Sequence, residues 1–263
     1  MLSYQHGFHA GNLADVHKHS LLAWALNYMV QKDKPLSYIE THAGRGLYDL
    51  QDTQAQKTGE AATGIDIAAD WFSGDHPYRA VLTRVRDANG PSAYPGSPVV
   101  AAEILRPMDN IHLSELHPKE YAALQDNMRP YGGVIRQRDG WEMAMSTCPP
   151  DPRRGLMLID PSFEVKADYE TIPKTIAKLH RKWPVGVIML WYPILTDGPH
   201  RQMTSALRAL LADGFKHEVT FPPARPGHRM IGSGLFVLNP PYGLTEEAAS
   251  VARLFQDRIK TPM

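Results

Sequence analysis

The sequence has little of what a secreted or membrane-embedded protein needs. Its one cysteine, Cys148, cannot form an internal disulfide. Its longest unbroken apolar run, Val187 to Tyr192, is far shorter than the ~20 residues that cross a bilayer. The first residues lack the basic start and the apolar stretch of a signal peptide. We therefore expect a cytoplasmic protein without a membrane span.

Charge of one sign is not in excess either. The chain carries 28 lysines and arginines against 28 aspartates and glutamates, so its net charge is zero with histidine neutral. This balance gives no reason to expect a global electrostatic attraction to nucleic acid. Histidine, in contrast, is abundant at 12 residues, and four of them lie near the start of the chain: His6, His9, His17 and His19.

The composition and the order of the patterns favour one α/β domain. With 263 residues, 43% apolar and 21% charged, the chain suits one large domain or a domain with one insertion. Strand-like runs alternate with helical stretches, which predicts a mostly parallel sheet with helices on both faces. The strand-like runs are Leu36 to Glu40, Asn110 to Leu113, Gly133 to Arg136, Gly155 to Ile159, Gly186 to Leu190 and Leu235 to Leu238. The helical stretches are Ala14 to Lys32, His117 to Asn127, Thr171 to Arg181 and Glu246 to Lys260.

The segment between Asp49 and Pro95 has a different character. It is polar at first, then helical around Gly64 to Phe72 and Tyr78 to Asp87, and it shows no clear strand. We interpret residues 49–93 as an inserted helical subdomain. The main domain is then formed by residues 1–48 and 94–263.

Polar residues follow several predicted strands at their carboxyl ends, where open α/β sheets bind ligands. Gly44 and Gly46 follow the first strand, and they let a backbone approach a nucleotide-type cofactor, or they serve only the geometry of a turn. Glu115 follows the next strand and could accept both hydroxyl hydrogens of a ribose, or be a solvated surface glutamate. Asp139, followed by Gly140, could accept from an adenine amino group or form a turn.

The most informative motif is Asp160-Pro161-Ser162-Phe163, which directly follows a very apolar strand. It resembles the Asp/Asn-Pro-Pro-aromatic signature of methyltransferases that act on planar amino groups. The exocyclic nitrogen of adenine is a poor nucleophile because its lone pair is delocalised into the ring. A carboxylate and a backbone carbonyl that accept its two N–H groups stabilise the charge that develops during methyl transfer. The aromatic ring stacks on the base and orients it.

A rival motif lies near the end of the chain, at Asn239-Pro240-Pro241-Tyr242. It fits the signature more closely by its letters. The order along the chain favours Asp160, because the catalytic tetrad belongs after the fourth strand counted from the glycine loop. Asn239 instead follows the last strand.

The histidines near the start invite a metal hypothesis, which we do not favour. His17 and His19 are two residues apart, so a helix points them to different sides, and no carboxylate or cysteine cluster accompanies His6 and His9. We expect no metal site. A better interpretation is a polar lid or substrate contact formed by Tyr4, His6, Lys18 and His19.

Several blocks together resemble the RlmJ family of bacterial methyltransferases. The blocks are Met1-Leu2-Ser3-Tyr4-x-His6-x-Phe8-His9-Ala10-Gly11-Asn12-x-Ala14-Asp15-Val16-x-Lys18-His19, Thr41-His42-Ala43-Gly44-x-Gly46-x-Tyr48, Tyr94-Pro95-Gly96-Ser97-Pro98, Glu115-Leu116-His117-Pro118 and Leu190-Trp191-Tyr192-Pro193. The resemblance covers nearly the whole chain. It implies a class I (Rossmann-like) methyltransferase fold with a small helical insertion. It also implies methylation of N6 of one adenine in 23S ribosomal RNA, with S-adenosylmethionine as the cofactor.

The resemblance also implies roles for individual residues, to which the glycine loop adds Gly44, the tetrad adds Pro161 and Phe163, and the polar-lid interpretation adds His6. The cofactor-binding residues would be Lys18, His19, His42, Gly44, Ser97, Glu115, Asp139, Gly140 and Asp160. The catalytic residues would be Asp160, Pro161 and Phe163. The residues that meet the RNA would be Tyr4, His6 and Lys18. One departure is clear, since Ser162 and Phe163 stand where the family usually has a second proline and a tyrosine.

The partner and the chemistry leave alternatives. Local basic residues could contact RNA despite the zero net charge, and the candidates are Arg153, Arg154, Arg225, His228 and Arg229. The acceptor could instead be a DNA adenine or a protein glutamine, since both carry planar amino groups. A non-catalytic RNA-binding or assembly factor is a further alternative. A nicotinamide dehydrogenase is disfavoured because Asp49 replaces the third glycine of the dinucleotide fingerprint. We expect a monomer with no obligate protein partner.

Overall fold

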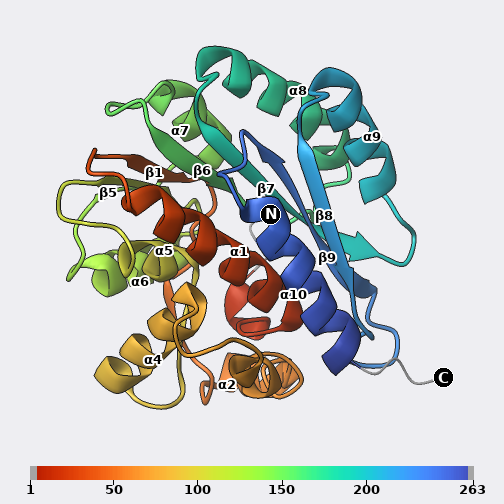
Figure 1. Cartoon of the computed structure of the whole chain (residues 1–263). Coiled ribbons are helices and arrows are strands. Elements are labelled where there is room, and N and C mark those ends of the chain that lie inside the picture. Colours follow the sequence, from red (N-terminus) through yellow and green to blue (C-terminus); the bar gives the residue numbers. More distant parts are fainter. Residues whose placement is uncertain (1–4, 260–263) are drawn as a thin grey trace.

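A computed structural model describes residues 5–259, with a seven-stranded sheet at the centre (Figure 1). The strands are β1 (Ser37–Glu40), β4 (Asn110–Ser114), β5 (Val134–Arg136), β6 (Gly155–Ile159), β7 (Val187–Leu195), β8 (Phe215–Thr220) and β9 (Met230–Leu238). Their order across the sheet is β5-β4-β1-β6-β7-β9-β8. The first five strands of this order are parallel, and β9 is antiparallel to both of its neighbours. The predicted α/β class with a mostly parallel sheet is confirmed.

Alternate residues of the strands face two separate cores. The helices are α1 (Leu13–Val30), α4 (Pro77–Asn89), α5 (Ser97–Ala102), α6 (Pro118–Met128), α7 (Gly140–Thr147), α8 (Asp168–Lys182), α9 (His200–Leu210) and α10 (Leu244–Arg258). Tyr38 and Leu156 belong to the core beneath α1, α4, α5, α6 and α10. Ile39 and Met157 belong to the core beneath α7, α8 and α9. Helices therefore cover both faces, and Figure 1 shows α1 and α10 side by side on one of them.

Helix α1 is buried on nearly every side. Asn12 caps its start, accepting a hydrogen bond from the Asp15 amide, and 13 of its 18 residues are buried. The buried set includes the polar side chains Asp15, His17, Lys18 and His19, which a helix tolerates in a core only when they have partners. No helix of the described chain, α1 included, has the length and apolar content needed to span a membrane.

The predicted insertion is mainly helical, but the expectation of no strand in it is wrong at both ends. Strand β2 (Leu47–Asp49) pairs antiparallel with β3 (Ala93–Pro95), and each is too short to show a period. Between them lie α2 (Thr53–Thr58), α3 (Ile65–Ala68), η2 (Ala69–Trp71) and α4. The apolar side of α4 packs in the same core as α1. That residues 49–93 form a separate subdomain therefore stays a prediction.

The sequence pattern also missed β8 and α9 and shortened β7. Strand β8 reads Phe-Lys-His-Glu-Val-Thr, in which polar side chains hide the strand pattern. Strand β7 continues through Pro193, a residue that usually argues against a central strand because it donates no hydrogen bond. The predicted helix over Gly64 to Phe72 is in fact two short pieces, α3 and η2.

The rival motif at Asn239 lies at the opposite edge of the sheet from Asp160. Because β9 is antiparallel to β7, its last residue Leu238 pairs with Ile188 near the start of β7. Asn239 has a φ of 51° and donates two hydrogen bonds of 2.8 Å, to the carbonyls of Pro184 and Gly186. The geometry therefore gives this motif a structural role in closing the end of β9.

Replacing Asn239 by alanine should destabilise the fold. The substitution removes both hydrogen bonds and places a residue that disfavours a left-handed backbone at a positive φ. We expect a loss of about 1–3 kcal/mol in the free energy of unfolding, measured by urea denaturation. The neighbouring Tyr242→Ala is the control, because this side chain is 85% exposed. Equal stability of Asn239→Ala and the wild type would contradict this role.

Candidate active site

A cavity of about 340 Å³ lies at the carboxyl ends of the parallel strands, within the usual size range of ligand pockets. Ten of the predicted site residues line it: His6, Lys18, His19, His42, Gly44, Ser97, Glu115, Asp160, Pro161 and Phe163. Asp139 and Gly140 are not among its lining residues, and Tyr4 lies outside the described residues. The cavity therefore brings together most of the residues that were predicted from separate parts of the sequence.

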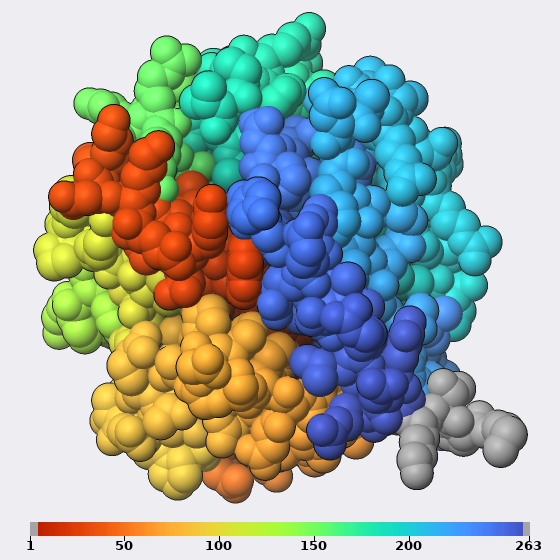
Figure 2. Space-filling model, viewed as in Figure 1, coloured from red at the N-terminus to blue at the C-terminus, as the bar shows by residue number. Residues whose placement is uncertain are grey.

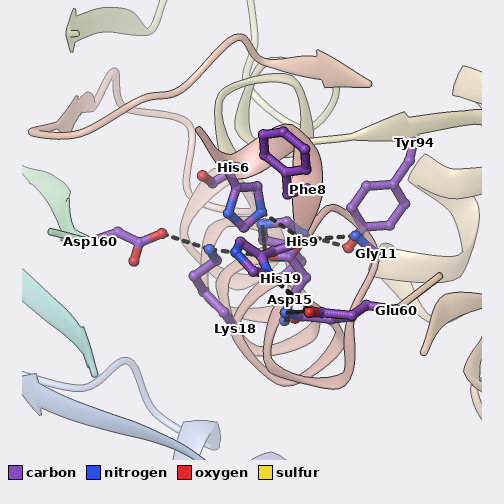
Figure 3. Close-up of polar contacts among 12 residues, drawn as sticks. His6, Phe8, His9, Gly11, Asp15, Lys18, His19, Glu60, Tyr94 and Asp160 are labelled. Carbon is purple, nitrogen blue, oxygen red and sulfur yellow. Dashed lines mark hydrogen bonds and ion pairs between the residues drawn. The ribbon is translucent and has the colours of Figure 1, made fainter. Parts of the chain in front are cut away.

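A buried lysine that lines this cavity lies between two carboxylates (Figure 3). Lys18 Nζ lies 2.6 Å from Asp160 Oδ2 and 3.1 Å from Asp15 Oδ1. Burial alone would lower the pKa of Lys18, but the two carboxylates more than offset it and raise that pKa above its ordinary value. The ammonium therefore stays charged and holds the α1 helix against the end of β6.

Asp15 was not predicted as a site residue, although it is the hub of this network. Its Oδ2 accepts from the amide of Gly11 at 3.0 Å and lies 2.9 Å from His6 Nε2. Burial would raise its pKa, but His6 and Lys18 outweigh burial and hold that pKa well below the usual value. In the sequence, Asp15 stood in the N-terminal block that carries the family resemblance, one turn before Lys18 on a predicted helix.

His6, Lys18 and His19, which were weighed as a polar lid or a substrate contact, line the cavity, and that interpretation stays a prediction. His19 is 1% exposed, and its Nδ1 lies 2.9 Å from the hydroxyl of Tyr94. Burial lowers the pKa of His19 to about 3, which keeps the ring neutral. Within residues 5–259, no group of three or more histidine, cysteine or acidic side chains is arranged to hold a metal ion.

The Asp160 turn presents a carboxylate and an aromatic ring to the cavity. Phe163 has a φ of 54°, which a bulky residue adopts only where the surroundings force it, as they often do at functional sites. Its ring packs against Tyr169 and Trp191, with centroids 5.0 and 6.1 Å away. Ser162 is exposed at the turn, so the serine creates no packing defect there.

Trp191 is a wall residue whose importance the sequence did not reveal. Its Nε1 donates to Ser233 Oγ at 2.9 Å, and the same oxygen lies 2.8 Å from His17 Nδ1. His17 Nε2 in turn lies 2.9 Å from His217 Nδ1, on the side of α1 away from His19. This series of hydrogen bonds fixes the position of the Trp191 indole. The Lys18 ammonium lies over the indole, 5.4 Å from the ring centroid.

Glu115 joins the glycine loop to the end of β4. Its two oxygens accept from the amides of Gly44 and His117, at 2.8 and 2.7 Å. Burial raises the pKa of Glu115. Gly44 has a φ of 60°, and a Cβ there would lie 2.6 Å from the Tyr48 hydroxyl, so this loop requires glycine. The carboxylate thus faces the cavity from a fixed position.

Asp139 and Gly140 lie behind His42. Asp139 caps α7 by accepting from the Glu142 amide at 3.0 Å, which is the turn alternative left open by the sequence. A Cβ on Gly140 would lie 2.0 Å from the carbonyl oxygen of Thr41, so this glycine lets α7 approach the loop after β1. Burial lowers the pKa of His42 to about 4.

Glu40, the last residue of β1, is a second buried carboxylate that sequence reasoning missed. It accepts hydrogen bonds from Ser97 Oγ at 2.5 Å and from the Tyr38 hydroxyl at 2.7 Å. Burial raises the pKa of Glu40 to about 8, although both hydrogen bonds oppose that shift. A charged residue inside a buried strand, directly before a glycine loop, was the available signal.

Glu40 should make the stability of the protein depend on pH. Its pKa in the folded protein is about 8, above the ordinary value of 4.5. The contribution of protonated Glu40 to the free energy of unfolding is therefore complete below pH 4.5 and is lost as the pH rises through about 8. Glu40→Gln is neutral at every pH, so its stability relative to the wild type should increase between about pH 5 and pH 8.5. Urea unfolding of both proteins measures this difference. A difference that does not change with pH would contradict the prediction.

Comparisons with known proteins agree with this geometry. The family model described as ribosomal RNA large subunit methyltransferase D, RlmJ, matches residues 33–262. Ribosomal RNA large subunit methyltransferase J of Escherichia coli is 36% identical, over 95% of this chain and 91% of its own. The protein of that name from Haemophilus influenzae is 35% identical, over 95% and 92%. A crystal structure of a Legionella pneumophila protein superposes with a TM-score of 0.84 at 35% identity, covering 93% of this chain and 92% of its own.

Fold, site and relatives lead to one assignment. The sheet with its antiparallel β9 between β7 and β8 is the class I methyltransferase fold that the resemblance implied. The family match spans well over half of the chain, and both curated relatives exceed 30% identity over nearly all of it. The chain belongs to the RlmJ family of ribosomal RNA large subunit methyltransferases.

Proposed function

We propose that this protein transfers a methyl group from S-adenosylmethionine to N6 of an adenine in 23S ribosomal RNA. One observation carries the proposal: Asp160 follows β6 at the cavity, beside Pro161 and Phe163, with its Oδ2 held by Lys18. A carboxylate next to an aromatic ring is the arrangement that methylation of a planar amino group requires. The curated relatives are named ribosomal RNA large subunit methyltransferases, which supports RNA as the acceptor.

The cavity residues fit S-adenosylmethionine. Glu115 is fixed by two backbone amides at the end of β4, where a carboxylate can accept from ribose hydroxyls. Gly44 lines the cavity, in the left-handed conformation that its loop requires. Lys18, His42 and Ser97 supply polar groups from three other segments for its charged amino acid end. When bound, the cofactor supplies an electrophilic methyl group on a sulfonium.

The residues of this chain then bind and orient the adenine. Lys18 holds Asp160 Oδ2, and we assign Asp160 Oδ1 to one hydrogen of the amino group. The carbonyl of Pro161 accepts the other. Both acceptors stabilise the positive charge that grows on the nitrogen as it becomes tetrahedral. Phe163 stacks on the base, and its contact with the hydrogen-bonded Trp191 limits the movement of the ring.

RNA reaches this cavity across the loop between β8 and β9. His228 lines the cavity and Arg225 lies exposed on the same loop, whereas Arg229 is an ion-pair partner of Asp197. Arg154 donates to the carbonyl of Lys34 directly before β6, at the edge away from the cavity. Of the basic residues weighed from the sequence, those on this loop are therefore better placed than Arg154 to contact RNA, and His6 also lines the cavity. The predicted RNA contact of Tyr4 lies outside the described residues. A target adenine must leave its stack to reach Phe163.

The compartment and the oligomeric state belong to the same proposal. Because the proposed substrate is ribosomal RNA, we propose that the protein acts in the cytoplasm. Of the large apolar side chains that are exposed, Tyr28 and Tyr242 lie together, with ring centroids 6.5 Å apart. Others, for example Ile67, Val134, Val185 and Leu210, lie on separate elements, which supports a monomer.

The test is methyl transfer from labelled S-adenosylmethionine to unmodified 23S RNA, followed by digestion and identification of the nucleoside. We expect N6-methyladenosine at one site. Parallel reactions contain DNA and protein acceptors. Label in DNA or in glutamine, or cofactor binding without transfer to any acceptor, would contradict the proposal.

In the same assay, Asp160→Ala should lower the turnover number by about 100-fold or more, because the change removes the acceptor for the amino group and the partner of Lys18. Asp151→Ala is the matched control, since Asp151 is exposed in the loop between α7 and β6 and does not line the cavity. Full activity of natively folded Asp160→Ala would exclude the mechanism.

A further inference from the structure

The helical insertion binds the segment that leads into α1. The amide of Ile65 donates to the carbonyl of Gly11 at 2.7 Å, and a Cβ on Gly64 would lie 2.1 Å from that oxygen. Thr58 Oγ1 donates to the carbonyl of Phe8. These contacts place α2 and α3 directly against residues 8–11. These residues precede α1, the helix that carries Asp15 and Lys18.

Glu60, between α2 and α3, is the buried charge at this junction (Figure 3). It is 3% exposed, and its carboxylate lies 3.0 Å from His9 Nδ1 and accepts from Asn12 Nδ2 at 3.1 Å. His228 Nε2, from the loop between β8 and β9, lies 4.0 Å away. A buried carboxylate is retained only with such partners, and removing it leaves them unpaired.

Asn12 connects Glu60 to the catalytic network. While its Nδ2 donates to Glu60, its Oδ1 accepts from the amide of Asp15 at 2.9 Å. Asp15 binds Lys18, and Lys18 binds Asp160. A continuous series of polar contacts therefore runs from the insertion to the carboxylate at the cavity. Rotation of the Asn12 amide would interrupt it at the first turn of α1.

We propose that Glu60 is a positioning residue for methyl transfer, through which the insertion sets the Lys18–Asp160 pair by way of Asn12 and Asp15. The proposal rests on the proposed function. It gives the insertion a role in the reaction itself, because Glu60 reaches the cavity only through other side chains. His9 contacts both carboxylate oxygens of Glu60, and His228 lies 4.0 Å from Oε1.

The first measurement does not depend on methyl transfer. In the cofactor-free protein, Glu60→Ala should speed amide hydrogen exchange in the first turns of α1 at least tenfold, since Asn12 loses its anchor. Asp70→Asn is the control, because this carboxylate belongs to the insertion and its side chain is 85% exposed. Exchange as slow as in the wild type and the control would overturn the proposal, whatever the substrate.

The second measurement compares the turnover number of variants with that of the wild type in methyl transfer to 23S RNA. Glu60→Ala should lower the turnover number about 10- to 100-fold, while the calorimetric affinity for S-adenosylmethionine stays within threefold. Glu60→Gln can still accept from Asn12 and should recover part of the loss. Turnover is normalised to the concentration of cofactor-binding sites, so unfolded protein does not count.

A double substitution tests the route. If Glu60 acts through Asn12, then Glu60→Ala combined with Asn12→Ala should lower turnover no more than the more severe single change. Fully additive losses, or turnover of Glu60→Ala equal to that of Asp70→Asn, would overturn the proposal. A wild type that does not methylate RNA would instead refute the proposed function, and hydrogen exchange would still decide the role of Glu60.

Discussion

The rest of the site depends on one buried cation. The side chain of Lys18 is 4% exposed, and such an ammonium is retained in a protein interior only if carboxylates surround it. Asp15 comes from the same helix and Asp160 from the end of β6, so their pairing fixes the position of α1 over the sheet. Removal of any of the three charges leaves a buried charge uncompensated. The three side chains therefore depend on one another for their positions.

The sequence predicted the parts of the site that follow from strand order. Gly44, Glu115 and Asp160 each follow an apolar run, and the carboxyl ends of parallel strands meet at one edge. The choice of Asp160 over Asn239 also agrees with the geometry, because an antiparallel last strand ends at the other edge. These inferences needed only periodicity and the order of the elements.

The residues that the sequence missed depend on distant contacts. Each of them is recognised by a hydrogen bond to a residue far away in the sequence, and no local pattern links the two partners. The pairs are Glu40 with Ser97, Trp191 with Ser233, and Glu60 with Asn12. Buried polar side chains such as these disturb the apolar period that identifies strands and helices. Polar side chains therefore explain both the missed strand β8 and the missed site residues, whereas β7 was shortened at Pro193.

In the proposed reaction, Lys18 acts on methyl transfer through Asp160. The most direct measurement is a double-mutant cycle of Lys18→Met and Asp160→Ala on the single-turnover rate of methyl transfer to 23S RNA, with saturating cofactor. We predict that the double variant is no slower than Asp160→Ala alone, because the lysine has lost the carboxylate that it holds. Independent, multiplicative losses from the two substitutions would contradict it.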